Sequence, residues 1–128
     1  MSQTIEQLAH LANEVLDKAY GYGISQPGQN FGWLSSVESA RAAKEAVENG
    51  ITKIDDIAAA VHSGWNRTAI ADFRGELELD TPTTTERKAK RNLLAQMPYE
   101  HLPEEEKEKD RVVARAILIA LKGGQNEV

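Results

Sequence analysis

Apolar residues recur every three or four positions along most of the chain, the spacing that places them on one face of a helix. The first such stripe predicts a helix in residues 5–19 that ends at Gly21 and Gly23. Four glycines and one proline fall within residues 21–32, which predicts a loop there. The stripe consists of Ile5, Leu8, Leu11, Ala12, Val15, Leu16 and Ala19.

Two capping-box patterns predict the next helix starts. Ser35 with Glu38 opens a second helix, which Gly50 stops. Thr52 with Asp55 opens a third, which reaches the glycine of the sequence "AAVHSGW". One face of this third helix carries Ile54, Ile57, Ala58 and Val61.

The pattern weakens in residues 66–85. This segment either holds a helical turn and a short strand at residues 76–79, where polar and apolar residues alternate, or is a loop. Thr83 with Glu86 then opens a fourth helix, and Pro98 ends it. Pro103 begins a fifth helix that runs to the glycines at 123 and 124. The prediction is therefore a mainly α, single compact domain of about five helices, with a short β-hairpin in the middle.

Composition narrows the functional classes. The net charge of −5 disfavours non-specific binding of nucleic acid, and the absence of cysteine excludes disulfides and thiolate metal sites and fits a cytoplasmic protein. No run of about 18 apolar residues occurs, so we expect no membrane span. The first residues contain acids and no basic start, which predicts no signal peptide.

Residues that could carry catalysis are sparse. The chain has three histidines and no HExxH, P-loop or GxGxxG motif. We therefore predict no enzyme activity, no metal site and no cofactor. His62 is interpreted either as a partly buried, hydrogen-bonded side chain or as a ligand contact. The acids in "EEEKEKDR" are explained by the helix dipole and by solvation of a helix surface.

The two tryptophans stand out in an alanine-rich chain. Trp65 is either a core anchor or a flat platform on which a base stacks. Arg67 follows it closely, and three further cations that could contact phosphates cluster later in the chain, namely Lys88, Lys90 and Arg91. A second interpretation of the same region is a helix-turn-helix, in which a glycine turn separates a helix from a recognition helix starting at Asn66.

Two segments together resemble the ryanodine-receptor repeat, or RyR domain. The sequence "IAAAVHSGWNRT" resembles its His-x-x-Trp helix, and "MPYEHLPEEEKEKDR" resembles its second signature. The resemblance covers residues 51–122, leaving residues 1–50 as a helical extension packed on that core and residues 123–128 as a frayed tail. The Gly-Trp pair that usually follows the first tryptophan is missing. The matched residues are His62, Trp65, Pro98, Tyr99, Leu102, Pro103, Glu106, Lys107, Asp110 and Arg111.

The resemblance implies a small, free-standing bacterial or phage binding module that is not an enzyme. Adenine nucleotides are among the ligands of the repeat in receptors, where repeats occur in pairs, so a homodimer is one expected assembly. By this resemblance, Trp65 stacks on the ligand, the turn at residues 98–103 faces it, Tyr99 lies near the cleft, and Lys107 or Arg111 lies at the rim. The predicted ligand-binding residues are His62, Trp65, Arg67, Tyr99, Lys107 and Arg111.

Three functions therefore stand as hypotheses. The first is a non-catalytic module that binds a nucleotide or nucleotide-derived signalling molecule between the Trp65 helix and residues 98–103. The second is a protein–protein interaction module without a small ligand. The third is a helix-turn-helix regulator, which the acidic net charge disfavours because duplex DNA attracts cationic surfaces.

Overall fold

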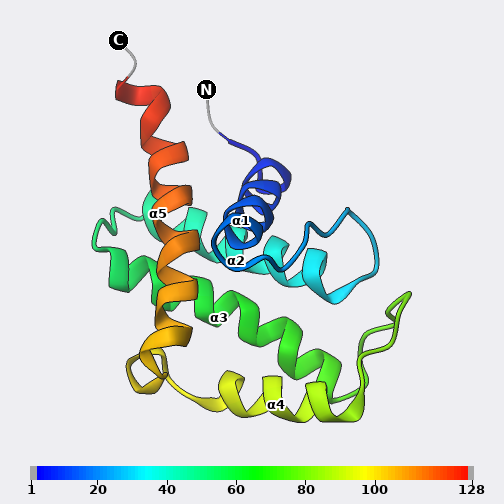
Figure 1. Ribbon diagram of the computed structural model, residues 1–128. Helices are drawn as coiled ribbons and strands as arrows, with labels where there is room; N and C mark the ends of the chain where they lie inside the picture. Colours follow the sequence, from blue (N-terminus) through cyan, green and yellow to red (C-terminus); the bar gives the residue numbers. More distant parts are fainter. Residues whose placement is uncertain (1–2, 127–128) are drawn as a thin grey trace.

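The computed structural model describes residues 3–126, and side chains up to residue 123. It is mainly helical and forms one domain, as predicted. Figure 1 shows α3 through the middle of the molecule, with α4 below it and α5 rising along one side. The elements are α1 (Ile5–Tyr20), α2 (Phe31–Glu48), α3 (Ile54–Phe73), α4 (Thr85–Gln96), the 3₁₀ turn η1 (Tyr99–His101) and α5 (Glu104–Asn126).

The predicted β-hairpin is wrong. The structure assigns no strand within residues 3–126, and residues 76–79 are a loop. The alternation that suggested a strand survives as alternating burial, because Leu77 and Leu79 are partly buried while Glu76 and Glu78 are exposed. The loop is instead joined to residues 21–30 by a backbone bond from the Asp80 N–H to the Gln29 carbonyl, 2.7 Å long.

The helix starts differ from the predicted capping boxes. The second helix begins at Phe31, where the Asn30 side chain accepts a bond from the Trp33 N–H, so the predicted Ser35 cap lies inside the helix. The third is preceded by Lys53 and has no side-chain cap, so the Thr52 box is also wrong. The fourth is capped by Thr84, one residue later than predicted. Short polar side chains occur inside helices as well as at caps, which is why the pattern misled.

The third helix runs without interruption from Ile54 to Phe73. The glycine turn required by the helix-turn-helix interpretation is therefore absent. Gly64 lies inside the helix because α3 crosses α2 there at short range: a Cβ at Gly64 would overlap the carbonyl of Glu38 and lie 2.8 Å from the Cα of Ser39. The Ser39 hydroxyl donates across the same crossing to the Val61 carbonyl, 3.2 Å away.

One hydrophobic core joins all parts of the chain. The first two helices contribute to the same cluster as α3, η1 and α5, so α1 and α2 are part of this core. The small residues of α1 and α2 allow this close packing. The fully or nearly fully buried members include Leu8, Ala9, Ala12, Ala40, Ala43, Ile57, Ala58, Val61, Val113, Ala114 and Ile117.

The last helix continues past its predicted end. It passes through Gly123 and Gly124 to Asn126, so residues 123–126 are helical, and the rest of the predicted frayed tail, residues 127–128, lies outside the described residues. None of the helices in residues 3–126 combines the length and apolar composition that a membrane crossing requires.

The crossing at Gly64 generates a stability prediction. Gly64→Ala should destabilise the protein by about 1–3 kcal/mol, because the new methyl group meets backbone that has no room to move. Gly123→Ala is the matched control: Gly123 is also helical, its Cβ would meet nothing within 4 Å, and alanine favours helix. Chemical denaturation should show a loss for the first variant and none for the second. An equal or higher stability of Gly64→Ala would contradict the crossing.

Candidate functional site

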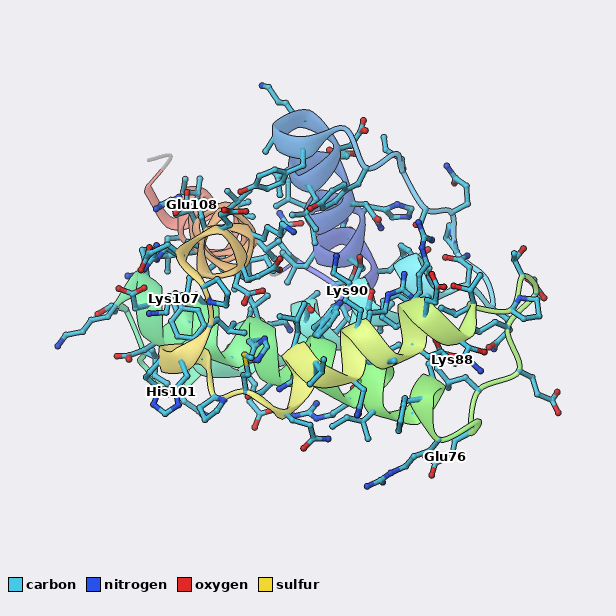
Figure 2. The ribbon with its side chains drawn as sticks, turned by 60° about the horizontal axis from the view of Figure 1, so that its bottom comes forward. Glu76, Lys88, Lys90, His101, Lys107 and Glu108 are labelled. Atoms are coloured by element: carbon cyan, nitrogen blue, oxygen red, sulfur yellow. The ribbon has the colours of Figure 1, made fainter. Side chains whose placement is uncertain are left out.

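A cleft of about 690 Å³ opens between the helices, and all five helices contribute to its walls. The loop at residues 22–25 completes the lining. In Figure 2, Lys90 projects from α4 on the side of that helix that faces α1 and α5. This volume lies within the range of small-molecule sites in proteins.

Aromatic side chains lie along one wall of the cleft. Trp65 is partly buried, lies outside the core cluster and lines the cleft, so the structure places it as a cleft residue rather than a core anchor. Trp33 is the core tryptophan, with 8% of its surface exposed. The Trp65 ring is nearly parallel to His62 at 6.1 Å between centroids, and meets Phe31 edge-on at 6.2 Å. A flat ligand ring would extend this group.

Basic side chains of α4 gather along one edge of the cleft. Arg87, Lys90 and Arg91 come from α4 at spacings of three and four, so one face of that helix presents all three to the cleft. The Arg91 guanidinium lies 3.7 Å from the centre of the Phe31 ring. Its other contacts are the Thr83 hydroxyl at 3.4 Å and the buried Asp72 carboxylate at 3.9 Å. Arg91 is therefore held in place before any ligand binds.

The second helix supplies a line of serines at the base of the cleft. Ser35, Ser36 and Ser39 are all buried and line it. The hydroxyls of Ser35 and Ser39 donate to backbone carbonyls, whereas Ser36 makes no such bond within the described residues. The three serines thus place hydroxyl groups in the lining of the cleft, where a polar group of a ligand could bond them.

His62 and Asp110 form a buried pair between α3 and α5. The His62 Nε2 donates to the Met97 carbonyl at 2.9 Å, and its Nδ1 lies 3.6 Å from the Asp110 carboxyl. Burial lowers the pKa of His62. Burial, helped by the nearby Glu106 carboxylate, raises the pKa of Asp110 from 3.8 to about 8. At neutral pH the pair is therefore largely uncharged, with Nδ1 as the acceptor.

Four of the six predicted ligand-binding residues lie outside the cleft. Only His62 and Trp65 line it. The Tyr99 ring is buried, and its hydroxyl donates to Asp55 at 2.8 Å. Arg111 bonds the same carboxylate at 2.8 Å and also Glu104 at 2.9 Å. These bonds lower the pKa of Asp55, Arg111 contributing most.

The other two predicted residues also have protein partners. Lys107 pairs with Glu104 at 3.7 Å, and its ammonium lies 5.8 Å from the Tyr99 ring. Figure 2 shows Lys107 at the first turn of α5, above η1 and His101 and away from Lys90. Arg67 is exposed and pairs with Glu38 at 3.4 Å. The structure therefore gives the second signature of the RyR resemblance a role in fastening η1 to the starts of α3 and α5.

Several residues that line the cleft were not predicted from the sequence. Arg87 was missed although it shares a helix face with the noted Lys90 and Arg91, Ser35 was interpreted as a cap, and Ser36 and Ser39 were not considered. The third noted cation, Lys88, instead lies 4.0 Å from Asp72. Helical spacing alone could have grouped Arg87 with its neighbours, but only the packing shows which face meets the cleft.

Among the side chains described, no three potential metal ligands cluster. No protein-family model matches the chain, and comparison with curated proteins and with solved structures finds no significant match. The cleft itself is therefore the feature from which a function can be inferred.

The His62–Asp110 pair generates a pH prediction. Because the folded-state pKa of Asp110 is raised, the unfolded chain releases this proton first, and the folded state loses stability as pH rises from about 4 to about 8. Asp110→Asn removes this loss, so its free energy of unfolding relative to wild type should increase across that range by on the order of a few kcal/mol.

Asp55→Asn is the control of opposite sign. The pKa of Asp55 is lowered, so its contribution is present above its ordinary value and is lost as pH falls. Urea titrations at pH 4, 6 and 8 provide the measurement for Asp110→Asn, and titrations below pH 4 are added for Asp55→Asn, because the Asp55 contribution is nearly constant between pH 4 and pH 8. A pH-independent difference between Asp110→Asn and wild type would show that the carboxyl titrates normally.

Proposed function

We propose that the protein is a non-catalytic module that binds a nucleotide or a nucleotide-derived signalling molecule in this cleft. The observation that carries the proposal is the joint presence of a partly exposed aromatic wall and a basic edge in one cavity. Bases stack on aromatic faces, and phosphates pair with arginine and lysine. The two requirements of a nucleotide are met in one cavity, whose lining includes both Trp65 and the cations of α4.

The local charge contrasts with that of the whole chain. The cleft is lined by four basic residues, Arg87, Lys90, Arg91 and Lys109, and by two acidic ones, Glu106 and Asp110. The raised pKa of Asp110 leaves it largely protonated at neutral pH. The chain as a whole carries −5. A basic cavity in an acidic protein favours a small anion that fits inside it over a long polyanion that must also meet the acidic surface.

This contrast also bears on the other two hypotheses. The cations of α4 line a cavity, and α3 is one continuous helix without the turn of a helix-turn-helix, so neither feature supports DNA reading. Of the exposed large apolar side chains, Leu93 and Ile119 are the most exposed, and they come from different helices. The RyR resemblance agrees with a small-ligand module, with the contact residues reassigned to the cleft.

Tryptophan fluorescence tests the proposal directly, because the chain has two tryptophans and only Trp65 lines the cleft. Titration with nucleoside phosphates should change the emission of wild type and of Trp33→Phe, and leave that of Trp65→Phe unchanged. Trp65→Ala should weaken binding by about 1–3 kcal/mol. It should cost less stability than the roughly 3–5 kcal/mol typical of a core tryptophan, because Trp65 is only partly buried.

Matched charge variants provide the control. Lys90→Gln removes a cation from the cleft, and Arg67→Gln removes one that lies outside it. The first should weaken binding and the second should not. If no nucleoside phosphate changes the fluorescence or raises the melting temperature of wild type at millimolar concentration, the proposal is wrong.

A further inference from the structure

A second hollow of about 570 Å³ adjoins the cleft. Five residues line both cavities, so the two share a wall rather than lying on separate faces: Ser25, Phe31, Gly32, Arg87 and Arg91. The shared wall is tightly packed, because a Cβ at Gly32 would overlap the Ser25 hydroxyl. A molecule that lies along the basic edge of the cleft is therefore next to the hollow, because Arg87 and Arg91 line both cavities.

The lining of the hollow is suited to an anion. It contains two arginines, no acidic residue, and the hydroxyl-bearing residues Ser25, Thr81, Thr83 and Thr84. The two arginines lie four residues apart on α4, where like charges repel. Burial and then the neighbouring Arg87 lower the pKa of Arg91. An anion between the two guanidinium groups would relieve this repulsion.

The two arginines differ in what already holds them. Arg91 contacts the Phe31 ring, the Thr83 hydroxyl and the Asp72 carboxylate. Arg87 is exposed and has no carboxylate partner at ion-pair distance among the described residues, although it lines both cavities. Arg87 is therefore the cation most available to a ligand group that crosses from the cleft into the hollow.

The order of groups along the shared wall sets the order of groups in the ligand. Trp65 lies 6.2 Å from Phe31, and Phe31 lies 3.7 Å from the Arg91 guanidinium; Phe31 and Arg91 also line the hollow, whereas Trp65 lines only the cleft. A base at Trp65 would thus place its first phosphoryl group near Lys90 and Arg91. Anything attached to that group would pass Arg87.

Because the two cavities share lining residues, we propose that the ligand carries two consecutive phosphoryl groups. The first lies in the cleft, and the second lies in the hollow together with any group attached to it. The inference rests on the proposed function and specifies its ligand as a nucleoside diphosphate or a diphosphate-linked nucleotide rather than a nucleoside monophosphate.

Calorimetric titration with AMP, ADP and ADP-ribose, and with GMP and GDP to vary the base, provides the test. Wild type should bind the diphosphates more tightly than the monophosphates. Arg87→Gln should reduce diphosphate affinity about tenfold or more, and should reduce the diphosphate-to-monophosphate affinity ratio. Lys90→Gln, whose side chain lines only the cleft, should weaken both classes by a similar factor and leave the ratio unchanged.

A second variant tests the hollow without changing charge. Thr81 is exposed and lines only the hollow, so Thr81→Trp should obstruct ADP-ribose while leaving AMP affinity unchanged. If mono- and diphosphates bind equally well, and Arg87→Gln and Thr81→Trp leave their ratio unchanged, the two-phosphoryl inference fails while the nucleotide proposal stands. If none of the five probes binds, the proposed function itself fails.

Discussion

The close crossing of α2 over α3 at Gly64 is the constraint on which the rest of the structure depends. Helix axes approach this closely only where a side chain is absent, and here the backbone of Glu38 and Ser39 occupies the place of a Cβ. The crossing fixes the direction in which the face of α3 just before and after it points. His62 and Trp65 lie on either side of Gly64, so the same glycine that permits the crossing also directs both rings into the cleft.

The cleft then combines groups from distant parts of the sequence. Its lining includes the serines of α2, the His62 and Trp65 rings of α3 and the cations of α4. Asp110 of α5 also lines the cleft and lies beside His62. Buried partners hold two of these groups in position: the Met97 carbonyl holds His62, and Asp72 holds Arg91. Such preorganisation lowers the entropy cost of binding, because the side chains that meet the ligand are already ordered.

The helical class, the number of helices and the C-terminal ends of α1, α2 and α4 were predictable, because periodic apolar residues and proline or glycine stops act locally. The predictions failed where a residue serves a distant partner. Gly64 was interpreted as a turn because its reason for being glycine lies on α2, and Ser35 was interpreted as a cap because its role lies in the cleft wall. The strand predicted at residues 76–79 is absent because the alternation of polar and apolar residues reflects alternating burial in a loop. A strand would also need a second strand to pair with.

The predicted site residues fall into two groups, those that line the cleft and those that are paired within the protein. Trp65 was found as one of only two tryptophans, and His62 as one of three histidines, and the resemblance to a His-x-x-Trp helix joined the two. Tyr99, Lys107 and Arg111 carry the pattern of a signature, but their atoms are bonded to Asp55 and Glu104 or packed together. These side chains hold η1 against α3 and α5. The charge pattern of the sequence does not distinguish a cation that is paired within the protein from one that is available to a ligand.

The most direct test of the account is to locate the bound ligand by nuclear magnetic resonance. Backbone amide and indole N–H signals of the isotope-labelled protein would be followed during titration with ADP. The account predicts that the largest shifts occur at the Trp65 indole and at the amides of Ser36 and Arg91, all around the cleft. Largest shifts at Tyr99, Lys107 and Arg111 would contradict it, as would a saturated spectrum in which the Trp65 indole does not move.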